Sequence, residues 1–311
     1  MNARDAARLL QEKNNLLLVT HTNPDGDTIG SATALCSALR RRGKTAWLYP
    51  NRQVSTKLAR WCESYFAPED FRAEYTVSVD VATEKLFALG FEGRVDFCVD
   101  HHPMNTHYAR RELVVPDRSS CGEIVLDIIK ALCAKPSREE ADLLYIALST
   151  DTGCFQYANV NARSFRAAAE LSEAGADLPS LNLSFFRKVS DARIRLEGML
   201  YNSMTFHHGG KVVFAAVTRE MLRTAGATED DCDDLAGLPG RAESGVLTVL
   251  IREQADGSSK VSVRSLPGVS SSAVCAAFGG GGHLQAAGCT IPEPPERAKE
   301  MLLAVIDEVL R

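Results

Sequence analysis

Between residues 15 and 135, short apolar runs alternate with segments of helical pattern, and this alternation restricts the possible folds more than any other feature of the sequence. The apolar runs cover residues 16–20, 45–49, 77–80, 95–99 and 113–115. The clearest helical segments between them cover residues 28–42, 83–89 and 122–132. Because strands that alternate with helices form βαβ units, the pattern predicts an α/β domain whose mostly parallel sheet has helices on both faces.

Acidic and imidazole side chains gather where three of the apolar runs end. In chain order these side chains are His21 with Asp25 and Asp27, then Asp80, then Asp100, His101 and His102. A further acid, Asp151, follows an apolar helical run. Because parallel strands place ligands at their carboxyl ends, we expect these groups to meet at one edge of the sheet.

Several carboxylates in one place repel one another unless a cation holds them. Imidazole and carboxylate ligands together fit Mn²⁺, and Mg²⁺ fits where more water is retained. Six ligands exceed what one ion with open positions needs, whereas they suit a pair of divalent ions of the kind used in phosphoester hydrolysis. We expect Asp80, which stands alone on the middle strand, to bridge the two ions.

Each of these residues also has a purely structural interpretation. Asp25 lies in NPDG, a strong turn signal, and Asp27 taken alone is as good a helix cap as a metal ligand. Ser120 and Glu123 predict a capping box, and a free helix N-terminus at that point would favour a phosphate. The convergence on one edge, more than any single residue, favours the metal site.

A different pattern begins near residue 205. Two strands flank His208-Gly209-Gly210, and a second pair flanks Asp256-Gly257, which predicts two hairpins. With a Gly-rich loop and a C-terminal helical pattern at 295–310, these hairpins indicate a smaller α+β domain. The predicted division is a first domain at 1–183, a helical linker at 184–204 and a second domain at 205–311.

The Gly-rich loop of the second domain predicts an anion site. Backbone N–H groups of Gly280, Gly281 and Gly282 can approach an anion closely, with His283 beside them. Arg264, at the end of a predicted strand, offers a planar fork for phosphate oxygens. The glycines alone would also fit a hinge, and Arg252 is as easily a solvated strand residue as a ligand.

Composition limits the partners and the compartment. The 311-residue chain has a net charge of −5, which argues against binding long duplex nucleic acid through its phosphates. Nine Cys occur without a C-x-x-C pair, as expected of small buried side chains in a reducing compartment. No apolar run approaches the roughly 20 residues that cross a bilayer. We expect a cytoplasmic protein that does not bind membranes, and the sequence is compatible with a homodimer.

The motifs resemble those of the DHH phosphoesterase family, named for the triplet at residues 100–102. HTNPDGDTIGS, SVDVAT, CVDHHPMN and STDTGCFQ resemble its N-terminal motifs, while KVSVRS and FGGGGHLQAAG resemble signatures of the associated DHHA1 domain. The resemblance spans nearly the whole chain in the family's order. The compact two-domain size resembles NrnA-type members more than the longer RecJ exonucleases.

The resemblance implies a role for each candidate residue. It implies that two Mn²⁺ ions are held by His21, Asp25, Asp27, Asp80, His101 and Asp151. It also implies that His102 contacts the scissile phosphate and that the DHHA1-like domain holds the terminal phosphate and nucleoside of the substrate. None of these positions departs from the family pattern.

The expected activity is hydrolysis of very short RNA, such as the dinucleotide pApA, to mononucleotides, together with removal of phosphate from pAp (3′-phosphoadenosine 5′-phosphate). One alternative is a phosphodiesterase for cyclic dinucleotides such as cyclic di-AMP. A second is a nucleotide-binding module without metals, although every acid of the cluster is present. A pyrophosphatase or polyphosphatase is disfavoured by the GGGGH loop.

Overall fold

The structure, a computed structural model, describes residues 1–310 and forms two compact units. The first unit is Met1–Lys188, and the second begins at Val189. The predicted limits of the domains and linker stay predictions. Within the predicted linker, the π-helical turn η3 (Leu183–Arg187) belongs to the first unit. Helix α8 (Asp191–Asn202) packs against α9 (Arg219–Ala225) and β7 (Val212–Val217) of the second unit.

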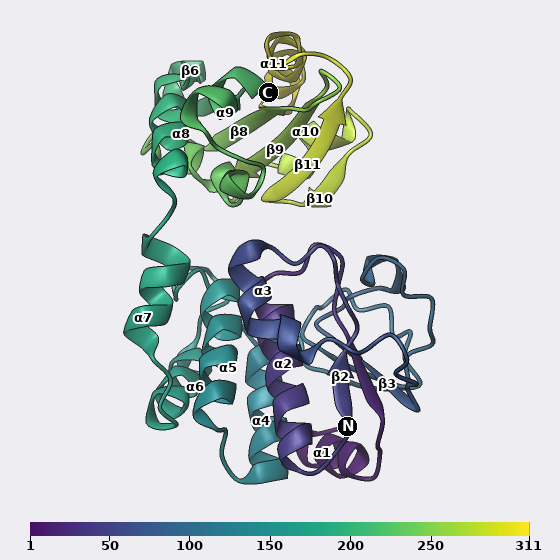
Figure 1. Ribbon diagram of the computed structural model, residues 1–311. Coiled ribbons are helices and arrows are strands. Elements are labelled where there is room, and N and C mark those ends of the chain that lie inside the picture. Colours follow the sequence, from purple (N-terminus) through teal and green to yellow (C-terminus); the bar gives the residue numbers. More distant parts are fainter. Residues whose placement is uncertain (311) are drawn as a thin grey trace. The chain divides into compact units, whose positions relative to one another are not determined.

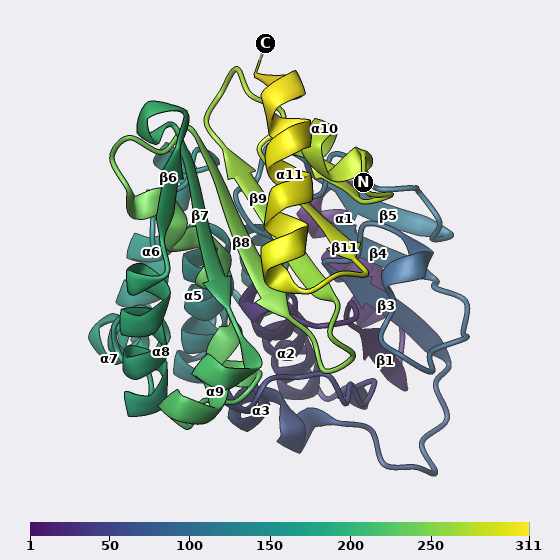
Figure 2. The same ribbon diagram turned by 90° about the horizontal axis from the view of Figure 1, so that it is seen from above.

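Five parallel strands form the sheet of the first unit, in the order β2-β1-β3-β4-β5 (Figure 1 and Figure 2). Their side chains are mostly buried, as expected for a parallel sheet that is covered by other elements. All five predicted strands are present, with ends shifted by up to two residues. The strands are β1 (Leu16–Val19), β2 (Ala46–Leu48), β3 (Tyr75–Val79), β4 (Phe97–Asp100) and β5 (Arg111–Val114).

A layer of helices packs beside this sheet. Helix α2 contacts β1, β2 and β3, helix α4 contacts β4, and α5 packs against both helices (Figure 1). Helix α2 is buried on almost every side, which explains its run of small and apolar residues. The helices of the unit are α1 (Ala3–Gln11), α2 (Gly26–Arg41), α3 (Thr56–Cys62), α4 (Cys121–Cys133), α5 (Arg138–Asp151), α6 (Ala162–Glu173) and α7 (Leu178–Asn182).

The helix predicted at 83–89 is wrong. This segment contains only one 3-10 turn, η2 (Glu84–Leu86). The backbone on both sides of the turn bonds to the chain after β1, because Thr22 N–H donates to Leu86 O over 2.6 Å and Ala88 N–H donates to Thr20 O over 3.0 Å. A segment of seven residues gains too little from its own helical bonds to compete with such pairing.

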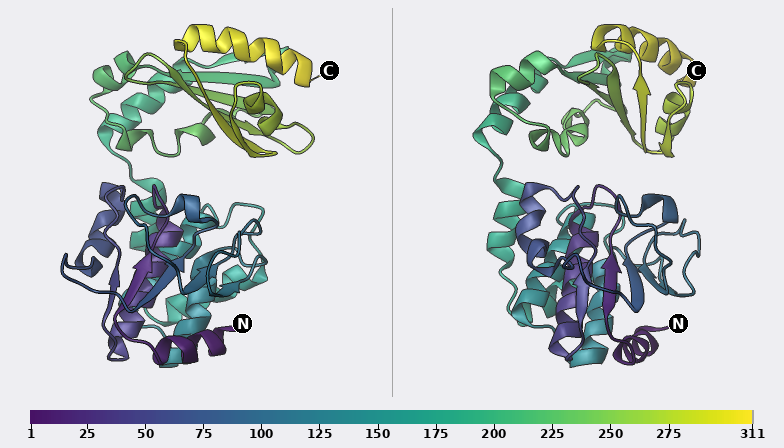
Figure 3. Two further views of the ribbon diagram at one scale, coloured as in Figure 1. Left: turned by 90° about the vertical axis from the view of Figure 1, so that its right-hand side faces the viewer. Right: turned by 45° about the vertical axis from the view of Figure 1, so that its right-hand side comes forward.

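The second unit is built on a six-stranded sheet in the order β10-β11-β9-β8-β7-β6, in which only β7 and β8 run parallel. Both predicted hairpins are present, as β6 with β7 and β8 with β9. Helix α11 lies along one face of the sheet (Figure 3), and apolar residues of α8 and α9 cover part of the other. The strands are β6 (Thr205–His207), β7 (Val212–Val217), β8 (Leu247–Glu253), β9 (Ser259–Ser265), β10 (Gly281–His283) and β11 (Ala286–Ile291).

The helices of the second unit are α8, α9 (Arg219–Ala225), α10 (Ser271–Ala276) and α11 (Pro295–Val309). The expected fold class is thereby confirmed: a parallel α/β sheet with helices is followed by a smaller α+β sheet. All nine Cys are free thiols, and seven of them are buried. Among residues 1–310, no helix combines the length and the apolarity that crossing a bilayer requires.

Gly30 of α2 permits the close approach of α5. A Cβ atom at this position would lie 2.3 Å from Leu143 O and 3.0 Å from Ala147 N, both on the α5 backbone. We predict that Gly30→Ala lowers the free energy of unfolding by about 1–3 kcal/mol through overpacking. Gly198→Ala in α8 is the matched control: its Cβ meets nothing within 4 Å, so it should stabilise by roughly 0.5–1 kcal/mol. Urea titration measures both, and equal midpoints would contradict the packing argument.

Candidate metal centre

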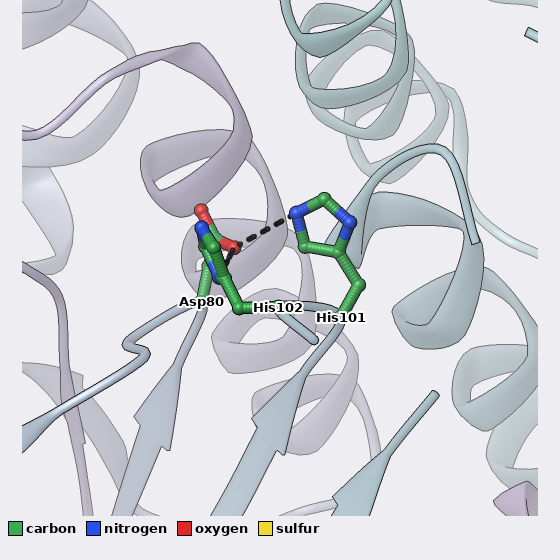
Figure 4. A group of neighbouring side chains, drawn as sticks. All are labelled: Asp80, His101 and His102. Carbon is green, nitrogen blue, oxygen red and sulfur yellow. Dashed lines mark ion pairs between the residues drawn. The ribbon is translucent and has the colours of Figure 1, made fainter. Parts of the chain in front are cut away.

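The site forms where β1, β3 and β4, three neighbouring strands, reach their carboxyl ends. His21 follows β1, Asp80 follows β3, and His101 follows β4. Asp25 and Asp27 lie at the start of α2, and Asp151 is the last residue of α5. The structure brings all six predicted ligands together. Figure 4 shows Asp80 facing His101 and His102 at the ends of their strands.

The six side chains form two groups that share Asp80. His21 Nε2 lies 3.6 Å from Asp25 Oδ1 and 3.9 Å from Asp80 Oδ2. His101 Nε2 lies 3.5 Å from Asp80 Oδ1, and it lies 3.6 Å from both Asp27 Oδ2 and Asp151 Oδ2. Each oxygen of Asp80 therefore faces a different histidine. This is the arrangement required of a carboxylate that bridges two ions.

Asp80 has a strained backbone conformation, and one oxygen of its buried carboxylate lacks a hydrogen-bond partner among the described residues. Its φ of 60° lies in the left-handed region, which residues other than glycine rarely adopt. Its side chain is buried, with 2% of the residue exposed, and Oδ1 has no hydrogen-bond partner among the described residues. A buried carboxylate oxygen without a donor is unfavourable, so a cation at this point would remove the cost. The residues present therefore fit a divalent metal.

The carboxylates of the cluster repel one another. Burial, followed by the charges of Asp27 and Asp25, raises the pKa of Asp80 well above its ordinary value. Burial, followed by the charge of Asp151, does the same to the pKa of Asp27. Burial raises the pKa of Asp151 to about 6 despite the attraction of His101. Without a cation, the cluster resists full ionisation.

Backbone carbonyls orient the two histidines that are candidate metal ligands. Nδ1 of His21 lies 2.8 Å from Thr22 O, and Nδ1 of His101 lies 3.1 Å from Arg118 O. Because a carbonyl oxygen only accepts hydrogen bonds, each Nδ1 carries the proton, and Nε2 presents its lone pair in the neutral ring. Both Nε2 atoms face the carboxylates, which is the tautomer and orientation that a metal ligand requires.

Asp100 is a buried positioning residue to which the sequence reasoning assigned no role. Its carboxylate accepts from His102 Nδ1 over 2.7 Å, from His101 N–H over 2.8 Å and from Asn105 Nδ2 over 2.5 Å. Burial is the largest single influence and opposes ionisation, but the hydrogen bond and charge of His102, together with the bond from Asn105, outweigh it and lower the pKa of Asp100. The signal was its place at the head of the triplet, whereas nothing in the sequence indicated Asn105.

The helix cap considered for Asp27 is wrong, because α2 begins at Gly26 and Asp25 is its cap. The Asp25 carboxylate accepts the N–H groups of Asp27 and Thr28, each over 3.0 Å. Asp27 instead accepts two N–H groups from another helix, α4, at Cys121 over 2.7 Å and at Gly122 over 3.0 Å. A turn-and-cap role and a place in the cluster thus coexist at Asp25.

The free N-terminus considered for α4 is also wrong, because Asp27 occupies it. Ser120 caps this helix by accepting Glu123 N–H over 3.3 Å, as predicted. The reciprocal half of the predicted capping box does not form, since the Glu123 carboxylate accepts from Ser119 Oγ over 2.5 Å. The positive end of α4 stabilises an acid of the cluster and is closed to a phosphate.

The predicted anion ligands of the second unit lie on one exposed face of its sheet. His283 pairs with Ala286, and Ala286 pairs with Arg264 on the next strand, so both cationic candidates project from the same face. Arg252 differs, because its guanidinium lies 3.4 Å from Glu229. The sheet thus presents Arg264 and His283 to solvent on one face, with Ala286 of β11 between them, whereas Arg252 already has an acidic partner.

The glycines of this loop have structural reasons of their own. A Cβ on Gly280 would lie 2.3 Å from Gly288 O, and one on Gly282 would lie 2.5 Å from Ala286 O. Gly282 also has a φ of 142°. Of the three predicted anion ligands Gly280, Gly281 and Gly282, only Gly281 has open space around it, with nothing within 4 Å of a Cβ. Close pairing of β10 with β11 therefore accounts for Gly280 and Gly282, and ligand binding stays a prediction for all three.

Both units match domains of a known protein family. The model of the DHH family, N-terminal domain, matches residues 15–148, and that of the DHHA1 domain matches residues 209–311. The bifunctional oligoribonuclease and PAP phosphatase NrnA of Thermus thermophilus is 33% identical over 95% of this chain and 90% of its own. The cyclic-di-AMP phosphodiesterase GdpP of Bacillus subtilis is 23% identical over 94% of this chain but only 48% of its own.

A solved structure has the same fold along nearly the whole chain. The exopolyphosphatase-related protein from Bacteroides fragilis superimposes with a TM-score of 0.88 at 22% identity, covering 98% of this chain and 96% of its own. That likeness concerns the fold alone. Since both units match their domain models and the Thermus relative aligns from end to end, the chain belongs to the DHH family, in the two-domain NrnA-type arrangement with a DHHA1 domain.

Proposed function

We propose that the chain is a metal-dependent phosphoesterase that hydrolyses very short oligoribonucleotides, such as pApA, to mononucleotides and also dephosphorylates pAp. The observation that carries the proposal is the pair of ligand groups sharing Asp80. The names of the NrnA relatives, which are oligoribonucleases and PAP phosphatases, support the choice of substrate. The chain aligns with those proteins over nearly their full length, whereas it spans only half of GdpP, so cyclic di-AMP is the second candidate substrate.

The proposed cofactor is a pair of divalent ions held by the six side chains. One would lie among His21, Asp25 and Asp80, and the other among Asp27, His101 and Asp151, with Asp80 shared. Two imidazoles among the ligands favour Mn²⁺ over Mg²⁺. When bound, such ions lower the pKa of a water molecule and neutralise charge on phosphate oxygens.

His102 is proposed to contact the phosphate that is cleaved. Its ring is partly exposed, and Nδ1 is occupied by the bond to Asp100. Nε2 is therefore the ring nitrogen left to contact a phosphate oxygen, to which it can donate when it also carries a proton. Because Asp100 also accepts from His101 N–H, one buried carboxylate sets the direction of both histidines. In its protonated form, His102 would stabilise negative charge that develops on the phosphate.

The second unit is proposed to hold the terminal phosphate and nucleoside. The Arg264 guanidinium and the His283 imidazole would contact the phosphate on its exposed face, and the open space at Gly281 would let the phosphate approach the backbone closely. A local anion site of this kind suits a chain of net charge −5 and a short substrate, and it gives no means of holding long duplexes. Nine free thiols suit a reducing compartment, so a cytoplasmic location belongs to the proposal, while the homodimer stays a prediction.

Asp80→Asn tests the shared ligand. Asn, like Asp, tolerates the left-handed backbone conformation at this position. The substitution removes a carboxylate whose ionisation is unfavourable in the metal-free protein. We expect the chelator-treated variant to melt no lower than the native protein at neutral pH, and to lose the stabilisation that added Mn²⁺ gives. Thermal melting with and without MnCl₂ measures both effects. Exposed Asp70→Asn is the control of equal charge; a full Mn²⁺ shift in Asp80→Asn would refute the shared ligand.

The stability of the metal-free protein should fall as pH rises from about 4 to beyond 6. The pKa of Asp151 is about 6 in the folded state and 3.8 ordinarily, so the folded state holds this proton more tightly. Stability is present while Asp151 is protonated and is lost as it ionises; the raised pKa values of Asp27 and Asp80 act in the same direction.

Melting curves of chelator-treated native protein and Asp151→Asn across this range measure the effect. The native protein should lose more stability than the variant between these pH values, and added Mn²⁺ should restore most stability above pH 6. Parallel pH profiles for the two proteins would contradict the assignment to Asp151.

A length series tests the substrate class. We predict that, with Mn²⁺, 5′-phosphorylated dinucleotides give the highest kcat/KM and that kcat/KM falls steadily toward decamers. The proposed anion site of the second unit, called the clamp below, holds one terminal phosphate, and each further phosphate brings negative charge without a partner. The products are followed by anion-exchange chromatography, with pAp and cyclic di-AMP assayed beside them. Rates that increase with length, or no hydrolysis of any of these compounds, would overturn the proposal.

Two arginine variants serve as controls for the clamp in the same assay. Arg264→Ala should raise KM for pApA, whereas Arg297→Ala, an exposed arginine of α11 paired with Glu300, should leave KM unchanged. Equal KM values in the two variants would remove Arg264 from the proposal.

A further inference from the structure

An exposed aromatic side chain lies on the loop that follows the metal-ligand candidate Asp151. Tyr157 is 60% exposed, although aromatic rings lose contact with water when they can pack into a core. No hydrogen bond to its phenolic oxygen forms within residues 1–310. Neither the metal centre nor the core of the unit uses this ring, so its position needs another explanation.

The ring rests on the bare backbone of Gly153, two residues after Asp151. A Cβ on Gly153 would lie 2.4 Å from both Cε1 and Cζ of the Tyr157 ring. Gly153 also has a φ of 55°, which glycine adopts without cost. The absence of a side chain at Gly153 therefore allows one edge of the ring to sit against the backbone while much of the ring stays in solvent.

The loop between the two residues is held in an unusual conformation. Cys154 and Phe155, with φ of 54° and 66°, continue the left-handed turn begun by Gly153. Such a run is unfavourable unless surrounding contacts impose it. Cys154 N–H donates to Ser149 O over 2.7 Å, and Tyr157 N–H donates to Thr152 O over 3.1 Å.

Further contacts tie the loop to the cluster. The Asn159 amide donates to Asp151 O and to Ser119 O, each over 3.0 Å. Phe155 stacks on Phe165 with ring centroids 5.3 Å apart. These contacts act on both sides of Tyr157 and fix its backbone relative to Asp151. The ring is consequently a preorganised apolar surface at a set place beside an acidic, polar centre.

We propose that Tyr157 is a stacking surface for a nucleobase of the substrate whose phosphate is at the metal centre, an inference that rests on the proposed function. Every base has a π-face, so stacking on an aromatic ring binds bases with little preference for sequence. The acidic cluster attracts no base by itself, and the ring supplies the apolar contact that it lacks. Inorganic phosphates offer nothing to such a ring, so Tyr157 selects nucleotides over them.

Tyr157→Ala and Tyr157→Phe separate stacking from other roles. A lost stack weakens binding of substrate and transition state alike, so we expect Tyr157→Ala to raise KM for pApA about tenfold with kcat little changed. Tyr157→Phe should behave as the native protein does. Phe206→Ala, which removes a comparably exposed ring on β6 of the second unit, is the matched control and should change neither constant.

Abasic substrates complete the test. Two analogues of pApA, each lacking one adenine, are assayed with the native protein and with Tyr157→Ala. For one analogue the native protein should show the same tenfold rise in KM, and Tyr157→Ala should add no further loss. The proposal would be overturned if, for both analogues, the rise in KM from the missing base and the rise from Tyr157→Ala multiplied as independent effects. An equal fall in kcat of Tyr157→Ala on all substrates would likewise show that the ring acts through the structure. The native protein alone with the abasic analogues decides the matter if the Ala variant does not fold.

A binding measurement separates this inference from the proposed function. Calorimetry with an analogue of pApA that carries a methylene group in place of the scissile oxygen gives Kd for the native protein and the Tyr157 variants. If Tyr157→Ala bound the analogue more weakly but the native protein did not hydrolyse pApA, the stacking role of Tyr157 would stand and the proposed phosphoesterase activity would be refuted. Hydrolysis of pApA with equal Kd values would do the reverse, and no binding of the analogue would overturn both.

Discussion

Mutual repulsion of buried carboxylates is the constraint on which the rest of the first unit depends. Asp27, Asp80 and Asp151 all have pKa values raised by burial and by one another or by Asp25. Such a cluster lowers stability unless something positive is near. The fold supplies part of this at the N-terminus of α4, whose Cys121 and Gly122 N–H groups meet Asp27. Within residues 1–310 no such donor reaches Asp80 Oδ1, and this is where a cation is needed most.

Rigidity is the second requirement, because a metal centre needs ligands that keep their places when the ions leave. Backbone carbonyls hold the rings of His21 and His101, and the buried Asp100 holds His102. Asp80 keeps a left-handed φ at the end of β3, where its N–H donates to Val99 O over 2.9 Å. The sheet thus supports an arrangement that is locally unfavourable. Strain of this kind persists only where surrounding contacts determine it.

Features that depend on where strands end could be predicted from the sequence. Features that depend on hydrogen bonds to backbone far away in the chain could not. The meeting of the six candidate ligands could be predicted because each follows a strand or borders a helix, and parallel strands share one edge. The partner of Asp27 was not accessible, since the start of α4 lies more than ninety residues away. The helix expected at 83–89 failed for the same reason, because its backbone pairs with the chain beside His21. Likewise, the tight pairing that requires Gly280 and Gly282 is visible only once β10 and β11 are side by side.

The negative net charge of the chain is connected with the proposed preference for short substrates. An acidic centre cannot attract a polyanion by itself, and a chain of net charge −5 has no general means of doing so. The groups proposed for binding are accordingly few and local: cations at the cluster, the Arg264 and His283 face of the second unit, and the ring of Tyr157. Under the proposed function each group would engage one phosphate or one base, so their summed contribution would be complete once a substrate of two nucleotides is bound. Every further nucleotide brings charge without a partner, and preference for the shortest substrates follows from that lack of partners.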